Sequence, residues 1–132
     1  MRVLSNSWDS AWVTVTPHEQ RCFINALGEI CHTFEMHDFE ASLGASREST
    51  QRLLQVIDGS YDEKHSVRML LNRAELRVMS NAMRITLQEI DDWEFHTRLG
   101  VSRGEWQEIL TQVDGILSSL DGTQKPAPSN DG

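Results

Sequence analysis

The sequence predicts an all-α protein, built from two tandem three-helix units that pack about a pseudo-twofold axis with a short two-stranded β-ribbon. The first observation behind this prediction is an internal repeat, because residues 15–59 align without a gap on residues 71–115. Of the 45 aligned pairs, 13 are identical, whereas ordinary composition would give about 3. The second observation is that apolar residues recur at helical spacing in both copies.

Length and composition indicate how the two copies are organised. The chain has 132 residues, of which 39% are hydrophobic and 24% charged, as is usual for a globular protein. A unit of about 45 residues rarely buries enough apolar surface to fold alone. We therefore predict one domain over residues 1–121, made of repeats 11–59 and 67–121, followed by a disordered tail over 122–132.

Each repeat begins its first helix with the same capping pattern. Thr16 supplies a cap hydroxyl, Pro17 occupies the first helical position and Glu19 follows three residues after the cap. Asn72 and Glu75 repeat the scheme in the second copy. Apolar residues at helical spacing follow both starts, which predicts two helices of about five turns each.

A tight turn and a third helix follow in each copy. A short second helix is expected to end at Gly44 and at Gly100, where a left-handed residue is favoured. Ser46 and Ser102 then come two residues later and are suited to cap a third helix. The predicted unit is therefore a helix, a short helix, a tight turn and another helix.

Short strands are predicted directly before the first helix of each copy. Residues 11–15 (A-W-V-T-V) alternate and are β-branched, and residues 67–71 are their counterpart. Two strands related by a twofold axis would pair antiparallel and tie the copies together. Residues 58–65 then form the linker between the units.

The turn region resembles the centre of a helix-turn-helix. The residues that carry the resemblance are F-x-x-x-L-G-A-S-R at 39–47 and F-H-T-R-L-G-V-S-R at 95–103. In that family a short helix ends in Leu-Gly and a serine caps the recognition helix. This resemblance implies a DNA-binding transcriptional regulator as the alternative function. Its candidate nucleic-acid contacts are Arg47, Gln51, Arg52, Arg103 and Gln107.

A second resemblance covers most of each copy. I-N-A-L-G-E-I-C-H at 24–32 and D-F-E-A-S-L-G-A-S-R-E at 38–48 resemble a small uncharacterised bacterial helical family with N-A-L-x-E-[IV]-C and F-x-x-R-L-G-x-S-R-E motifs. Gly28 stands where that pattern prefers asparagine, and the second copy departs from it at 83–86. Because the family has no established activity, the resemblance implies a fold and not a function.

Catalytic and metal-binding patterns are absent from the sequence. The five histidines have no counterparts in the other copy and form neither H-E-x-x-H nor a Cys/His zinc spacing. The acidic cluster of Asp91, Asp92 and Glu94 fits a charged loop between helices better than a cation site, which needs convergent ligands. We therefore predict that the protein is not an enzyme and takes neither a cofactor nor a metal.

The cysteines and the apolar runs suggest a compartment. Cys22 and Cys31 lie nine residues apart on one predicted helix and point to opposite sides, so they cannot bridge each other there. They are expected to be small core residues in a reducing compartment. No apolar run reaches spanning length and the first residues do not form a signal peptide. The cytoplasm is therefore predicted, with no membrane partner.

Two recurring side chains have competing interpretations. Arg47 and Arg103 are either matched contacts on a partner or members of ion pairs with a nearby glutamate. Asn25 and Asn81 lie in mid-helix, where asparagine has no propensity advantage. A side-chain hydrogen bond to strand or linker backbone would explain the two asparagines better than a ligand would.

The best functional prediction is a small acidic bacterial inhibitor, immunity or adaptor protein, a monomer or weak homodimer. Its net charge of −8 suits a basic protein partner and disfavours nucleic acid. The four tryptophans have no aromatic counterparts in the other copy, so each either fills a core asymmetry or makes an asymmetric contact. The predicted partner-binding residues are Trp93, Trp106, Asp91, Asp92, Glu94 and Arg103.

Overall fold

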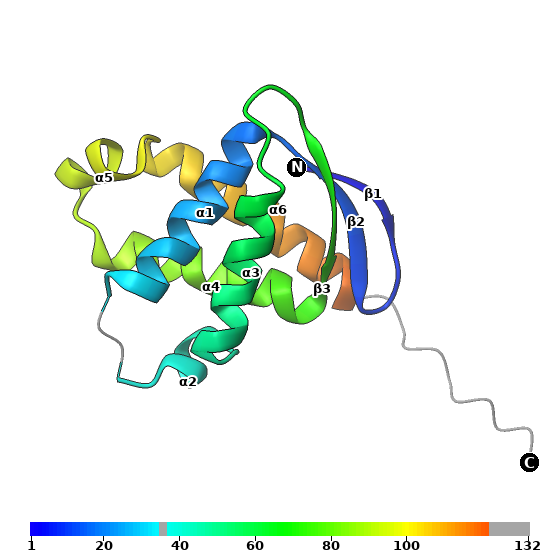
Figure 1. Cartoon of the computed structure of the whole chain (residues 1–132), viewed down its shortest axis with the longest axis horizontal. Coiled ribbons are helices and arrows are strands. Elements are labelled where there is room, and N and C mark those ends of the chain that lie inside the picture. The colour runs from blue at the N-terminus through cyan, green and yellow to red at the C-terminus, as the bar shows by residue number, and fades with distance from the viewer. Residues whose placement is uncertain (35–36, 122–132) are drawn as a thin grey trace, which may run out of the picture.

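The computed structural model describes residues 1–34 and 37–121 of the chain. The predicted tail over 122–132 therefore lies outside the described residues. A sheet lies on one side of the helices and α5 lies at the far end of the molecule (Figure 1). In chain order the elements are β1 (Arg2–Asn6), β2 (Ser10–Val15), α1 (Pro17–His32), α2 (Phe39–Leu43), α3 (Arg47–Gly59), β3 (Val67–Asn72), α4 (Arg73–Glu89), α5 (Asp92–Leu99) and α6 (Arg103–Asp121).

The prediction of an all-α fold is wrong. Helices hold 66% of the described residues and strands 14%, so the fold is helix-dominated but mixed α/β. The two expected strands are present as β2 and β3, and a third strand, β1, extends the sheet to the order β1-β2-β3. All five residues of β1 are exposed. Because β1 buries neither face, its sequence lacks the apolar alternation that identifies a half-buried strand.

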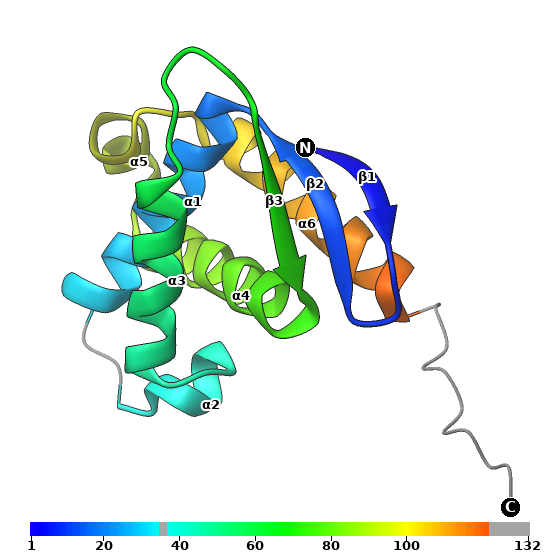
Figure 2. The same cartoon turned by 45° about the vertical axis from the view of Figure 1, so that its right-hand side comes forward.

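The sheet is antiparallel and buries one face. β2 pairs with β3 along its whole length, with Val13 opposite Met69 at the centre of the pairing. Val13 and Met69 are 56 positions apart, which is the offset of the sequence repeat. Both side chains are buried, whereas Trp12 and Leu70 of the opposite face are 45% and 50% exposed. The buried face contacts α6 and α4 (Figure 2).

The predicted starts of the two long helices are confirmed. The side chain of Thr16 accepts a hydrogen bond from the Glu19 amide at 3.1 Å, and the Glu19 carboxylate accepts one from the Thr16 amide at 2.9 Å. Asn72 and Glu75 form the same box, at 2.7 and 2.9 Å. These side chains satisfy amides that the first helical turn leaves unpaired.

The predicted tight turns are also confirmed. Gly44 and Gly100 have φ angles of 88° and 75°, in the left-handed region that glycine adopts at low cost. Ser46 then caps α3 by accepting from the Ser49 amide at 3.1 Å. The hydroxyl of Ser102 accepts from the amide three residues on at the same distance. The direction of α3 and α6 therefore depends on these two turns.

The two mid-helix asparagines bond to backbone, but not to the backbone that we expected. Asn25 on α1 donates from Nδ2 to the Leu99 carbonyl at 3.2 Å, and Asn81 on α4 donates to the Leu43 carbonyl at 2.9 Å. Both carbonyls belong to the last residue of a short helix, directly before its glycine. Each long helix therefore holds the end of the short helix from the other half of the chain.

One hydrophobic cluster joins the two halves. It includes Phe23 and Leu27 of α1, Met79 and Met83 of α4, and Trp106 of α6. All five side chains are at most 1% exposed. Burial of a large side chain stabilises a fold by about 2–3 kcal/mol. Since both halves contribute to the same core, packing stabilises them jointly.

Replacing Asn81 by alanine should destabilise the fold. The change leaves the Leu43 carbonyl without its partner, so we expect the free energy of unfolding to fall by about 1–2 kcal/mol. Urea denaturation measures this difference. Gln88→Ala on the same helix is the matched control, because Gln88 is exposed, and it should change the value by less than about 0.5 kcal/mol. Equal effects of the two substitutions would contradict the role of Asn81.

Candidate protein-binding surface

Helix α5 presents one tryptophan to solvent. Phe95 and Leu99, one turn apart, are 1% and 5% exposed and pack the inner side of the helix into the core. Trp93 lies on the other side, and 79% of it is exposed. Indole is among the largest apolar side chains, and most tryptophans in globular proteins are largely buried. Trp93 is therefore an unusual surface feature.

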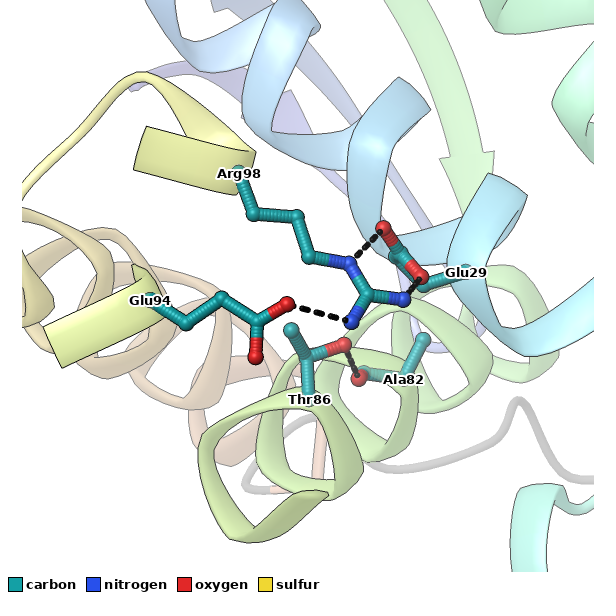
Figure 3. A network of polar contacts seen from close by, with 5 residues as sticks. All are labelled: Glu29, Ala82, Thr86, Glu94 and Arg98. Atoms are coloured by element: carbon teal, nitrogen blue, oxygen red, sulfur yellow. Dashed lines mark hydrogen bonds and ion pairs between the residues drawn. The ribbon is translucent and has the colours of Figure 1, made fainter. Parts of the chain in front are cut away.

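Two oxygens of Glu29 fix α5 against α1 (Figure 3). Arg98 of α5 donates from Nε and Nη2 to the Glu29 carboxylate at 3.0 and 2.6 Å. A weaker bond of 3.4 Å joins Arg98 to Glu94 one turn earlier. The hydrogen bonds that Arg98 donates to Glu29 raise the pKa of its guanidinium above the usual value. This bidentate geometry positions α5 more firmly than a single ion pair would.

Arg103 supports α5 and α4 from inside the protein. Its Nη1 and Nη2 donate to the carbonyls of Leu87 and Ile90 at 2.7 and 2.6 Å, at the end of α4. Its guanidinium also lies 4.8 Å from the centre of the Phe95 ring and pairs with Asp92. A cation is favourable at a helix C-terminus because the last carbonyls are unpaired. These bonds occupy the groups with which Arg103 was expected to contact a partner.

Arg47 plays the same part for α1. It donates to the Cys31 carbonyl at 2.8 Å and lies 4.4 Å from the centre of the Phe39 ring. The recurring arginines therefore bond helix-end carbonyls in both halves. The predicted ion pairs with Glu48 and Glu105 are not the ones that form, because Glu48 pairs with Arg52 and the acidic partner of Arg103 is Asp92.

Trp106 lies in the core. It is 0% exposed, and its indole nitrogen donates to the Met83 carbonyl at 3.0 Å. Its ring meets Phe95 edge to face, with centroids 5.4 Å apart and an interplanar angle of 90°. Of the two alternatives for this tryptophan, filling a core asymmetry is the one that the contacts fit. Trp106 is therefore part of the core and not of the protein surface.

The remaining acidic residues lie beside Trp93. Asp91 and Asp92 are exposed, and Asp91 makes no side-chain cap hydrogen bond at the start of α5. Glu94 is half-buried and is turned toward Arg98. We call Asp91, Asp92 and Trp93 the α5 surface. Sequence reasoning missed the Glu29–Arg98 pair because Ile85 and Ser42 occupy the aligned positions.

The arginines among the candidate nucleic-acid residues are bonded within the protein. Arg52 pairs with Glu48 at 2.7 Å on the exposed side of α3, and Arg47 and Arg103 bond helix-end carbonyls as described above. Gln51 is half-buried and Gln107 is exposed. The three arginines of this set thus all have intramolecular partners.

The structure offers little reactive chemistry in its described part. No group of three or more His, Cys, Asp or Glu side chains in residues 1–34 and 37–121 is arranged to hold a metal ion. Burial raises the pKa of the Cys22 thiol to about 12 and also raises that of Cys31. A thiol in this state is a poor nucleophile, because the thiolate is the reactive form. Within the same ranges, none of the helices has the length and apolar character needed to cross a bilayer.

Arg103→Gln should destabilise the fold, because glutamine cannot reach both carbonyls at the end of α4 or place a charge there. We expect the free energy of unfolding to fall by about 2 kcal/mol, the usual magnitude for hydrogen bonds to a charged group. Arg52→Gln provides the control: its ion pair is exposed, so its loss should cost less than about 0.5 kcal/mol. Chemical denaturation compares the free energies of unfolding of the two variants. An unchanged value for Arg103→Gln would show that the carbonyl contacts contribute nothing to stability.

Comparisons of the chain with protein-family models, with curated proteins and with solved structures found no match. Function has to be argued from the α5 surface and its surroundings.

Proposed function

We propose that this protein is a non-enzymatic binding module that recognises a basic protein through the α5 surface. A small acidic inhibitor, immunity or adaptor protein of the bacterial cytoplasm fits this description. The observation that carries the proposal is the 79% exposure of Trp93 on a helix whose inner side is fixed by Phe95 and Leu99. Tryptophan is enriched among the residues that dominate binding energy at protein interfaces.

Preorganisation favours binding through this surface. The Arg98–Glu29 bonds and the Arg103–Asp92 pair hold α5 in place before any partner arrives. A partner would therefore not have to order the helix, which lowers the entropic cost of association. The indole itself has only two rotatable bonds to fix.

Charge indicates the chemistry of the partner. Asp91 and Asp92 directly precede Trp93 on a protein whose net charge is −8. A partner with an apolar pocket rimmed by lysine or arginine would bury the indole and face the carboxylates. Complementary charge of this kind speeds encounter and excludes acidic competitors. The DNA-binding alternative has less in its favour, since its arginines are already bonded within the chain.

Trp93→Ala should abolish capture of the partner from nuclease-treated lysate, because truncation removes the central apolar contact. Its melting temperature should stay within about 2 °C of the wild type, since exposed side chains contribute little to stability. The matched control is Trp12→Ala, which removes a half-exposed tryptophan from the sheet and should leave capture intact.

The proposal would be overturned by equal capture with Trp93→Ala and the wild type. It would also be overturned if the captured material were nucleic acid lost on nuclease treatment. Capture should weaken as salt concentration rises, because the expected partner is basic.

A further inference from the structure

Two grooves in the molecule are lined by corresponding residues. The α3–α4 groove, of about 320 Å³, lies between α3 and the start of α4 and includes Leu53 and Glu75. The α6–α1 groove, of about 300 Å³, lies between α6 and the start of α1 and includes Ile109 and Glu19. Apart from Met1, every residue that lines the α6–α1 groove lies 56 positions from one that lines the α3–α4 groove.

In the α6–α1 groove, the first residue of the chain is the occupant. The Met1 ammonium pairs with Oε2 of Glu19 and donates to Oε1 of Gln112 at 3.0 Å. The Met1 side chain packs against the hydrophobic core. Oε1 of Glu19 is meanwhile used by the capping box of α1. This groove therefore binds a free α-amine that is attached to an apolar residue.

The α3–α4 groove offers the same carboxylate. Oε1 of Glu75 accepts from the Asn72 amide at 2.9 Å, while Oε2 accepts no hydrogen bond from residues of the described ranges. Leu53 and Val78 are 6% and 3% exposed and provide an apolar floor. Val56 stands where the other groove has Gln112, and it is 61% exposed. A carboxylate beside an apolar floor suits an amine on an apolar residue.

The strand that follows Met1 extends this correspondence. β1 pairs antiparallel with β2, placing Arg2 opposite Thr14 and Val3 opposite Val13. At its other edge β2 pairs with β3, and Val13 lies opposite Met69, its counterpart in the repeat. The two strands therefore pair through equivalent edges. The remaining edge of β3 thus corresponds to the edge of β2 that β1 takes. No strand of the described residues pairs with it.

We propose that the α3–α4 groove and the remaining edge of β3 together bind the amino-terminal segment of a partner protein. The partner's α-amine pairs with Glu75, and its apolar first side chain packs on Leu53 and Val78. Its next residues add a strand antiparallel to β3, with the second residue opposite Leu70 and the third opposite Met69. Strand addition at an open edge is a common mode of peptide recognition.

This site is independent of the α5 surface. It is built from α3, β3 and the start of α4, whereas α5 lies at the opposite end of the molecule from the sheet (Figure 1). Failure of one proposal therefore leaves the other standing. Together the two surfaces would let one chain bridge two proteins of different chemistry.

A peptide with the sequence Met-Arg-Val-Leu-Ser-Asn, copied from residues 1–6 and labelled at its C-terminus, is the probe. Fluorescence anisotropy with the full chain should show saturable binding. Acetylation of the peptide's amine should weaken binding at least tenfold, because it removes the charge that faces Glu75. Glu75→Gln should weaken it by a similar factor, since glutamine keeps the capping box but not the charge.

Two further variants control the assignment. Val56→Arg adds a second cation to the exposed rim of the groove, which Arg52 also lines, and should abolish binding without affecting the fold. Glu19→Gln makes the matched change in the α6–α1 groove and should leave peptide affinity unchanged. Upon binding, the backbone amide resonances of residues 67–71 should shift in NMR spectra more than those of residues 2–6.

Several outcomes would overturn the proposal. Undetectable binding at millimolar peptide concentration, or equal affinity for the acetylated peptide, would show that the groove does not bind an α-amine. Loss of binding in Glu19→Gln but not in Glu75→Gln would place the peptide in the other groove. Equal binding of a free lysine derivative, with unchanged β3 amides, would indicate a simple amine site and refute the strand addition.

Discussion

Two reciprocal hydrogen bonds constrain the rest of this structure: Asn25 holds the Leu99 carbonyl and Asn81 holds the Leu43 carbonyl. Each bonded carbonyl immediately precedes a glycine with positive φ, so the bond fixes the point at which the chain reverses into α3 or α6. The amides come from the long helix of the opposite half, so neither half can place its own turn alone. The helices that these turns bring together then bury their apolar side chains in one core shared by both halves.

The features proposed for binding lie where corresponding positions differ. Trp93 stands opposite His37 in the sequence alignment, and the Arg98–Glu29 pair has no counterpart in the other half. The two grooves differ in a similar way, because Met1 pairs with Glu19 whereas Glu75 keeps one carboxylate oxygen for a ligand. Residues that are identical in both halves, such as the arginines that cap α1 and α4, stabilise the fold. The α5 surface is therefore placed at divergent positions, whereas the α3–α4 groove is inferred from the matching glutamates Glu19 and Glu75.

Sequence reasoning predicted features that depend on neighbouring residues or on the internal repeat. The capping boxes and the Gly44 and Gly100 turns follow from local chemistry, and the pairing of β2 with β3 follows from the repeat. The structure contains all of them. It missed β1, whose exposed residues carry no periodic signal. It also could not tell that Trp106 is buried and Trp93 exposed, because both follow acidic residues and only tertiary packing separates them. The Glu29–Arg98 contact joins residues 69 apart that the repeat does not relate, because Ile85 and Ser42 occupy the aligned positions.

Native-state hydrogen exchange is the most direct test of the interdependence of the two halves. The amides of α1 and α4 should exchange only through global unfolding, with the same free energy in both helices, and Asn25→Ala should lower both values equally. The reciprocal hydrogen bonds and the common core require this result. Exchange of one helix at a distinctly lower free energy, with the other unaffected by Asn25→Ala, would show two separately stable halves and contradict the dependence described above.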